Sequence, residues 1–249
     1  MNLRMGHPAA LVDVCRIPEL QQLSMTPDGS LHVGAGVRQA DVLADREVGA
    51  RWPMLRRAIS EIGHPQIRSR GTVCGSIAHA DPAAELPAVA LALDATMVVR
   101  SRRGERRIAA EEFVLAPFTT VLEENEILIE VVFPPAGADS GWAFEEFATR
   151  RGDFATAGAA VRLVAGAGAV IDCRLALFGV GGRALRLSEA EEAVVGRPVD
   201  EEVLAAVHSA VESGLDPSPD VHASGEFRRE LAARLAVSTI ERAWERSNG

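Results

Sequence analysis

The sequence contains no lysine and no tyrosine, so all 26 of its basic residues are arginine. Without lysine, the chain has no Schiff-base nucleophile and no Walker lysine for nucleotide hydrolysis. Without tyrosine, it has no phenolic acid for proton transfer. These two absences exclude three common kinds of catalytic site, and we interpret them mainly as a compositional bias towards Ala, Gly, Arg and Val.

Cysteine is scarce as well. Cys15, Cys74 and Cys173 are widely spaced and form no C-x-x-C pair, so we expect neither an Fe–S cluster nor a structural zinc site. A reduced, cytoplasmic compartment is the simplest interpretation of this usage.

The sequence also shows no signal peptide and no apolar run long enough to span a bilayer, which predicts a soluble protein. The net charge of −9 argues against nucleic acid as a partner.

The first half of the chain alternates short strands with helices. Pro27-Asp28-Gly29 between two alternating segments predicts a hairpin, and the apolar run Ala10–Val14 predicts a further strand. The strand Ile127–Phe133 ends at two prolines. The other elements expected here are strands at 20–25, 30–34, 96–99 and 106–109 and helices at 37–44, 51–62 and 86–93.

The second half has a different pattern, after a short linker of small residues at 134–141. Strands are expected at 142–147, 156–164 and 170–180, followed by helices. Ser188 and Glu191 predict a capping box, and helices follow at 200–213 and 226–246. The apolar side of the last helix is expected to consist of Leu231, Leu235, Val237, Ile240 and Trp244. The strand and helix patterns of the two halves predict an α+β fold with domains at 1–135 and 141–249.

The segment Arg68–Glu85 lies between the helices predicted at 51–62 and 86–93 and is the richest in candidate functional groups. Gly71 and Gly75 allow a backbone turn whose N–H groups face an anion, and Thr72 and Ser76 add hydroxyl donors. The alternative is an ordinary strand-to-helix turn, since glycines and small polar residues occur in many such turns. The residues alone favour that turn, because short glycine motifs have a high false-positive rate.

Four segments in order along the chain resemble the medium, FAD-binding subunit of the molybdenum hydroxylases, the group of xanthine dehydrogenase and carbon monoxide dehydrogenase type enzymes. The second of them is long and specific, and the resemblance covers nearly the whole sequence. The segments are residues 1–14 (M-N-L-R-M-G-H-P-A-A-L-V-D-V), 63–88 (from G-H-P-Q-I-R-S-R-G-T-V-C-G-S to A-E-L-P-A), 126–134 (E-I-L-I-E-V-V-F-P) and 144–155 (F-E-E-F-A-T-R-R-G-D-F-A).

This resemblance implies a vanillyl-alcohol-oxidase-type (PCMH-like) FAD-binding lobe, followed by a C-terminal domain with a three-stranded antiparallel sheet and three helices. It also implies the residues that bind FAD. Glu85 matches an acidic residue that hydrogen-bonds the cofactor, and Arg150, Arg151 and Asp153 match an R-R-x-D run that we interpret as structural at the domain junction. The implied cofactor-binding residues are Thr72, Val73, Cys74, Gly75 and Ser76 of the second glycine-rich loop, with Glu85, Leu128, Ile62 and Glu145.

The sequence departs from the family's pattern in two places. The first glycine-rich loop, an A-G-G-[QH]-S run that normally precedes the segment resembling Met1–Pro8, is absent from the sequence, so we expect a lobe truncated at its N-terminus. Cys74 stands where the family usually has glycine. A side chain at a position with positive φ would cost about 1 kcal/mol of strain. We otherwise interpret Cys74 as a small, inert substitution.

By resemblance, the protein is an electron-transfer subunit. A large molybdenum subunit and a small 2Fe–2S subunit would form a heterotrimer with it, which itself dimerises, and FAD would pass electrons to NAD, a quinone or O2. No side chain of this chain is then required as a catalytic acid or base. His64 and His79 flank the loop and are interpreted as ordinary hydrogen-bonding residues. The alternatives are a flavin-free scaffold subunit of the same complex and a stand-alone flavin oxidase, for which the sequence offers no convincing acid–base set.

Overall fold

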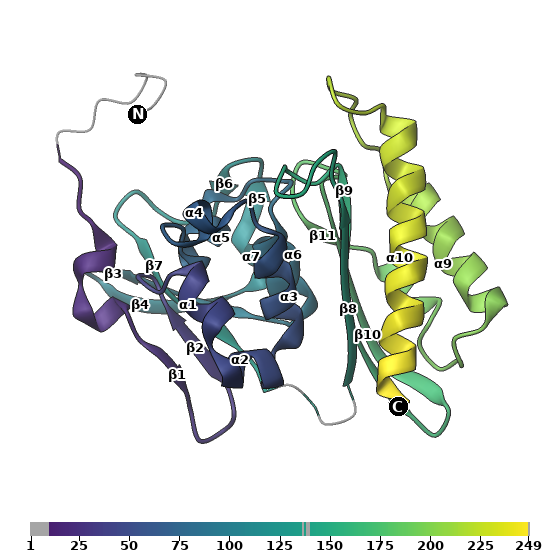
Figure 1. Cartoon of the computed structure of the whole chain (residues 1–249), viewed down its shortest axis with the longest axis horizontal. Coiled ribbons are helices and arrows are strands. Elements are labelled where there is room, and N and C mark those ends of the chain that lie inside the picture. The colour runs from purple at the N-terminus through teal and green to yellow at the C-terminus, as the bar shows by residue number, and fades with distance from the viewer. Residues whose placement is uncertain (1–9, 136, 138–139, 249) are drawn as a thin grey trace.

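The computed structural model of the chain describes residues 10–135, 137 and 140–248 and has two lobes, each with an antiparallel sheet and helices. Figure 1 shows the N-terminal lobe on the left and the C-terminal lobe on the right, with the helices α1–α7 between the two sheets and the long helix α10 along the outer side of the second sheet. The predicted linker joins the lobes between β7 and β8. Its residues 136, 138 and 139, and the opening segment Met1–Pro8, lie outside the described residues.

The N-terminal sheet has five strands in the order β1-β2-β7-β3-β4. The hairpin predicted at Pro27–Gly29 is confirmed: the Asp28 carboxylate accepts the Ser30 backbone N–H at 3.1 Å, and Gly29 has φ +87°. The strands predicted at 96–99 and 106–109 are also confirmed, and they pair with each other as β3 and β4. The strands are β1 Leu23–Met25, β2 Leu31–Gly34, β3 Thr96–Ser101, β4 Gly104–Ala109 and β7 Ile127–Phe133, and a separate pair consists of β5 Val114–Ala116 and β6 Thr119–Thr120.

The helices of this lobe are short, and prolines and N-caps set their boundaries. Pro53 and Pro65 begin α3 and α4 at positions where the missing N–H costs nothing, and Asp45 caps α2 by accepting two backbone N–H groups. Helix α6 is buried along its whole length, as its uniformly apolar sequence predicts. The helices are α1 Gln39–Ala44, α2 Arg46–Arg51, α3 Pro53–Glu61, α4 Pro65–Arg68, α5 Val73–His79, α6 Glu85–Ala92 and α7 Ala110–Phe113.

One predicted strand is wrong. Residues 10–13 have no regular structure, and a 3-10 turn, η1 Val14–Arg16, follows because the Asp13 carboxylate accepts the backbone N–H of Cys15. A second such turn, η2 Pro18–Leu20, replaces the start of the strand predicted at 20–25. An apolar run next to a capping aspartate therefore formed a local turn instead of pairing with the sheet.

The C-terminal sheet contains the three long strands that the sequence predicts, in the order β11-β10-β9-β8, with the two-residue strand β11 as an addition at one edge. Its short length explains why no period-2 pattern predicted it. The strands are β8 Ser140–Phe147, β9 Ala157–Gly166, β10 Ala169–Phe178 and β11 Leu185–Arg186. The three helices are α8 Ser188–Glu192, α9 Glu201–Gly214 and α10 Gly225–Ser247.

Two details of these helices differ from the predictions. Ser188 caps nothing, and the Glu191 carboxylate is buried, where it accepts the backbone N–H of Leu175 at 2.8 Å and pairs with Arg186, so the capping box is wrong. On α10, most of the predicted large apolar residues are only partly buried, and small residues form the buried line instead. This buried line comprises Ala232, Ala233, Ala236, Ile240 and Ala243.

The C-terminal sheet separates two cores. Alternate residues of β9 and β10 belong to different cores: Ala160, Ala176 and Phe178 pack with the N-terminal lobe, whereas Val161 and Leu175 pack under α9 and α10. The strand period of two explains this division, because successive side chains point to opposite faces. We call the face towards the N-terminal lobe the inner face and the face under α10 the outer face. The inner face brings residues of the second half up to the elements that carry the candidate site.

Candidate functional site

The segment Thr72–Ser76 is the start of helix α5. Its residues alone favour such a turn into a helix, whereas the resemblance identifies the segment with a glycine-rich loop. Thr72 is the N-cap, and its hydroxyl accepts the backbone N–H of Gly75 at 2.9 Å. Gly75 has helical backbone geometry and not a positive φ. A Cβ at Gly75 would lie 2.7 Å from the Thr72 hydroxyl oxygen, so glycine at this position leaves room for the cap. The structure therefore favours a helix start over a free loop.

Cys74 lies in this helix and is buried. Its thiol is 3.4 Å from the backbone carbonyl oxygen of Val33, and burial, with a smaller contribution from the Glu130 carboxylate, raises the pKa of the Cys74 thiol. Because the backbone here is helical, the strain that we expected at Cys74 is absent, and that expectation was wrong. A buried thiol that resists ionisation is a poor nucleophile.

Three arginines surround the start of α5. The Arg38 guanidinium donates to the backbone carbonyl of Arg70, and Arg68 donates to the carbonyls of Ile62 and Gly63 at 2.7 and 3.0 Å. Within the described part of the chain, no carboxylate pairs with Arg38, Arg68 or Arg70, so this turn has a net positive charge. We call these three residues the basic turn. It is suited to an anionic group.

Acidic residues gather at the opposite end of this region. Glu85 is the first residue of α6 and is only 6% exposed, and burial raises the pKa of its carboxyl to about 7. Glu146 on β8 reaches the same junction from the C-terminal lobe. Burial, and then the nearby charges of Glu85 and Glu61, raise the pKa of Glu146 to about 8.

The remaining predicted cofactor residues lie in different surroundings. Ile62 ends α3 and is buried, and Leu128 is a buried residue of β7 that pairs with Val99. Helix α5 packs against β7, and α3 packs against α6, so the structure brings the segments that carry Thr72–Ser76, Leu128, Ile62 and Glu85 together around the same helices.

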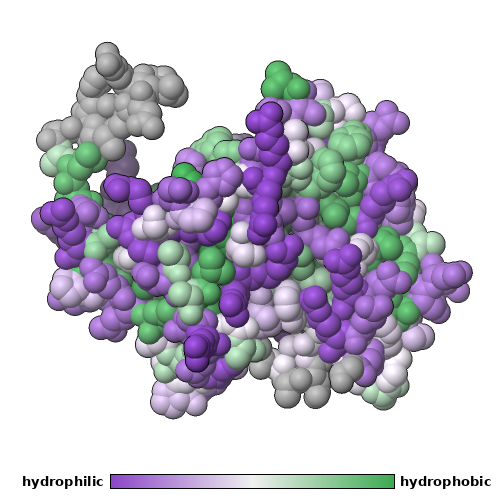
Figure 2. Space-filling model, viewed as in Figure 1, coloured by the Kyte–Doolittle hydropathy of each residue, from purple (hydrophilic) through white to green (hydrophobic). Residues whose placement is uncertain are grey.

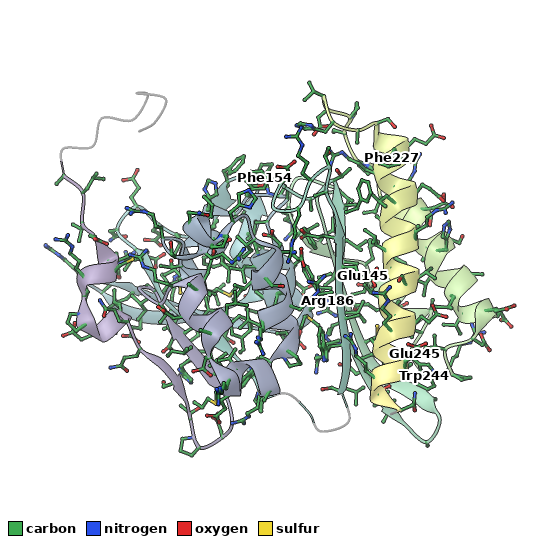
Figure 3. The ribbon with its side chains drawn as sticks, viewed as in Figure 1. Glu145, Phe154, Arg186, Phe227, Trp244 and Glu245 are labelled. Atoms are coloured by element: carbon green, nitrogen blue, oxygen red, sulfur yellow. The ribbon has the colours of Figure 1, made fainter. Side chains whose placement is uncertain are left out.

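Glu145 lies elsewhere. It is on the outer face of β8, where its carboxylate pairs with Arg242 of α10 and accepts the Ser238 hydroxyl at 3.2 Å. Figure 3 shows Glu145 between β8 and α10, whereas Arg186 lies on the inner side of the same sheet. The neighbouring residue Glu146 faces the N-terminal lobe. Our sequence reasoning missed it, although the alternation with Trp142 and Phe144 on the inner face of β8 could have identified it.

A cavity of about 860 Å³ opens beside the acidic end, between loops of the two lobes. Its lining includes Asp81 and Phe118 from the N-terminal lobe and Asp153, Phe154 and Arg228 from the C-terminal lobe. Figure 3 shows Phe154 at the upper edge of the molecule, near this entrance, and Figure 2 shows that hydrophilic side chains run down the middle of the same view, between the lobes.

The R-R-G-D run forms part of this junction. Gly152 has φ +86°, and a Cβ there would lie 2.9 Å from the backbone carbonyl oxygen of Gly63 and equally close to the His64 ring. The loop therefore presses directly on the turn that follows α3, which supports our structural interpretation of the run. His64 and His79 are exposed, and the His79 ring lies 5.1 Å from that of Phe118.

One further set of side chains has the chemistry of metal ligands. His208, Glu212 and Glu230 place one ligand atom each within 4.8 Å of one another across α9 and α10. These side chains are substantially exposed, and Arg234 already pairs with Glu230 at 2.5 Å. They lie in the helices on the outer face, and we assign them no role. Within the described ranges, none of the helices combines the length and apolar character needed to cross a bilayer.

The site has features suited to a dinucleotide such as FAD. The basic turn lies at the start of α5 and offers positive charge for phosphates. The buried carboxyl of Glu85, which forms no ion pair among the described residues, can bond to a sugar hydroxyl or a ring. The residues present therefore fit the cofactor that the resemblance implies.

Two protein families match the sequence in succession. The family described as "FAD binding domain in molybdopterin dehydrogenase" matches residues 1–136, and "CO dehydrogenase flavoprotein C-terminal domain" matches residues 142–243. The two matches together cover nearly all of the chain.

Proteins of known function also align with nearly the whole chain. The chain is 38% identical to the "6-hydroxypseudooxynicotine dehydrogenase complex subunit alpha" of Paenarthrobacter nicotinovorans, over 99% of this chain and 83% of the relative. It is 33% identical to the carbon monoxide dehydrogenase medium chain of Hydrogenophaga pseudoflava, over 99% and 85%. A solved structure of carbon monoxide dehydrogenase from that organism superposes with a TM-score of 0.95 at 35% identity, over 99% of this chain and 85% of the other.

Proposed function

The chain belongs to the family of FAD-binding medium subunits of the molybdenum hydroxylases, and from this premise we propose how its own residues hold the cofactor. It is an oxidoreductase subunit with FAD as its cofactor and an electron-transfer role. We propose that the basic turn and the start of α5 hold the pyrophosphate, and that Glu85, with Ile62 and Leu128, lies towards the rest of the cofactor. Support comes from the basic turn at one end of the region and the buried carboxyl of Glu85, a hydrogen-bonding group, at the other.

The chain's own residues have binding and shielding roles in this proposal. FAD, when bound, supplies the electron chemistry by accepting and releasing electrons. Arg38, Arg68 and Arg70 neutralise phosphate charge, and the backbone N–H of Cys74 at the start of α5 donates to a phosphate oxygen. The loop around Gly152 closes the junction between the lobes and limits access of water.

Among the residues implied by the resemblance, Glu145 is replaced in our proposal by Glu146. The ion pair of Glu145 with Arg242 holds it on the outer face, away from α3 and α6. Thr72 and Gly75 act through the helix start, as cap and as space for the cap, and Ser76 adds a partly exposed hydroxyl one turn further along α5.

We also propose the surroundings in which the chain works. The domains are 1–135 and 141–249, and the partners are a large molybdenum-cofactor subunit and a small 2Fe–2S subunit in a heterotrimer that dimerises. The final acceptor is NAD, a quinone or O2. The cytoplasm is proposed as the location, supported by three free cysteines.

The first test is the visible absorption spectrum of the purified chain before and after addition of FAD, with the released cofactor identified after denaturation. We expect flavin bands at near-stoichiometric occupancy. A folded chain that carries no flavin and takes up none would contradict the proposal and favour the flavin-free scaffold subunit.

A charge variant tests the phosphate assignment. Arg70 belongs to the basic turn and is exposed, so its guanidinium can be removed without disturbing the core. We expect Arg70→Gln to weaken FAD binding about tenfold, the effect of one charge-assisted hydrogen bond. Arg102→Gln, at an exposed arginine in the turn between β3 and β4, is the matched control and should leave FAD affinity unchanged.

A further inference from the structure

Two carboxyl groups from different lobes face the same junction, Glu85 buried and Glu146 half-buried. Glu85 begins α6, Glu146 lies on the inner face of β8, and α3 packs against both elements. The Oε2 atom of Glu146 is buried and has no hydrogen-bond partner among the described residues. For Glu85, the hydrogen bond that stabilises its charge comes from its own backbone N–H.

The charged groups around this pair do not neutralise it. Glu61 at the end of α3 and Asp81 before α6 add negative charge to the surroundings of Glu85, and Glu61 also acts on Glu146. Arg57 of α3 is the cation that acts on Glu146, and it already forms an ion pair with Glu61. A buried carboxylate and a half-buried one, neither with a counter-ion of its own, are unfavourable in the ionised form.

Glu145 provides an internal comparison. It is adjacent in the sequence and lies on the same strand, but its carboxylate has both an arginine and a serine hydroxyl as partners on α10. The charge of Glu145 is therefore compensated, whereas Glu146 is turned towards other carboxylates. The difference arises from the alternation of β8 alone.

We propose that Glu85 and Glu146 hold a proton at neutral pH, so that the chain presents a neutral carboxylic acid to its FAD site as a hydrogen-bond donor. This inference rests on the proposed function, since it concerns the same site. The raised pKa values, about 7 for Glu85 and about 8 for Glu146, agree with the burial and the missing counter-ion. A neutral acid can donate to a carbonyl or nitrogen acceptor, which a carboxylate cannot do.

The proposal gives FAD binding a pH dependence with a defined sign. Above about pH 8 both carboxyls ionise, lose the donor proton and place negative charge beside a cofactor that is itself anionic. We therefore expect FAD affinity to be full below pH 7 and to fall as the pH rises from 7 to 9.

The proton can be observed without the cofactor. Infrared spectra of the flavin-free chain between pH 5 and 9 report the carbonyl band of buried protonated carboxyl groups. We expect a band that disappears with a midpoint near pH 7–8, loses intensity in Glu146→Gln and is unchanged in the control Glu145→Gln. In Glu85→Gln, the midpoint of the remaining carboxyl should shift down, because one negative neighbour is removed. Complete ionisation of the wild-type carboxyls already at pH 6 would overturn the proposal.

The second measurement is the dissociation constant of FAD as a function of pH. We expect wild type and Glu145→Gln to bind about tenfold more weakly at pH 9 than at pH 6. Glu146→Gln should lose part of that dependence, since Glu85 still ionises in this pH range, and the double variant Glu85→Gln with Glu146→Gln should lose most of it. Equal pH dependence in Glu145→Gln and Glu146→Gln would contradict the proposal.

Thermal unfolding tests whether Glu146 is protonated even if FAD does not bind. The folded-state pKa of Glu146 is raised, so the stability it contributes is present below the unfolded pKa and is lost as the pH rises towards 8. Glu146→Gln should therefore melt at a higher temperature than wild type at pH 9 and at the same temperature at pH 5. Absence of FAD binding at every pH would contradict the proposed function, whereas the infrared and thermal results decide the proton on their own.

Discussion

The two faces of the C-terminal sheet are made from the same strands but hold different partners by different means. The outer face packs against α10 through small residues, so the backbones of β8 and α10 lie very close together. The inner face meets the N-terminal lobe through aromatic rings, a network of charges and the buried carboxyls Glu85 and Glu146. The comparison indicates that the close fit of small residues holds the helix, whereas charge contributes, together with apolar packing, to holding the lobe.

The charge network is centred on Asp94, in the turn between α6 and β3. Its carboxylate bonds Arg162 at 2.9 Å and Arg174 at 3.1 Å, and Arg186 lies 3.5 Å away. These three arginines stand on three neighbouring strands of the C-terminal sheet. One acidic residue of the first lobe therefore holds an arginine cluster of the second, which fixes the orientation of the sheet beside the site.

The largest effect is expected from Gly141→Ala on the outer face. A Cβ at Gly141 would lie 1.7 Å from the backbone carbonyl oxygen of Ala243, and neither backbone can move without lifting α10. We expect a loss of about 3 kcal/mol or more in the free energy of unfolding, measured by urea denaturation. Gly166→Ala is the control, since its Cβ would meet only the flexible, exposed end of Ile171. Equal stability of the two variants would show that shape does not fix the helix.

A smaller loss is expected from Asp94→Ala on the inner face. The change leaves three partly buried guanidinium groups with less compensation, and we expect about 1–2 kcal/mol of destabilisation because Asp94 is itself partly exposed to solvent. Asp172→Ala removes a carboxylate from Arg162 and Arg174 within one sheet and serves as the comparison. Hydrogen exchange should show loosening between the lobes for Asp94→Ala alone. The same exchange pattern in both variants would contradict a role for Asp94 between the lobes.

The smallest effect is expected from Arg242→Ala. Its ion pair with Glu145 lies on the outer face, where Arg242 is 56% exposed, and exposed pairs contribute about 0.2–1 kcal/mol. Chemical denaturation should give a change in this range that shrinks further in high salt. A loss as large as that of Asp94→Ala would show that charge also fixes the outer face.

The elements that could be predicted follow from local signals in the sequence, namely turn residues and the regular spacing of apolar residues. The hairpin at Pro27–Gly29, the strands β7, β9 and β10 and the helix α10 follow from turn residues and apolar periodicity. The wrong predictions lie where a single side-chain contact decides. The Asp13 carboxylate accepts a backbone N–H and so stabilises a turn where the run Ala10–Val14 predicted a strand. The Thr72 hydroxyl caps a helix that begins within the segment resembling a glycine-rich loop.

The candidate site shows the same division. The resemblance placed Glu85 and the segment Thr72–Ser76 in one region, and the structure brings their helices together. It selected Glu145 on β8, but a shift of one residue moves a side chain to the opposite face of a strand, so Glu146 is the residue at the junction. Only the partners on each side, α10 and the N-terminal lobe, distinguish these two glutamates.

The sequence by itself determined the order of strands and helices, the family and its cofactor, because periodicity, turn chemistry and motif spacing are local properties of the chain. The tertiary structure decided which carboxyls are compensated and which have a raised pKa, because burial and the distance to the next charge depend on elements far apart in sequence. Glu85, Glu146, Glu61 and Arg57 come from three separate segments, and their electrostatic free energy exists only once α3, α6 and β8 have packed together.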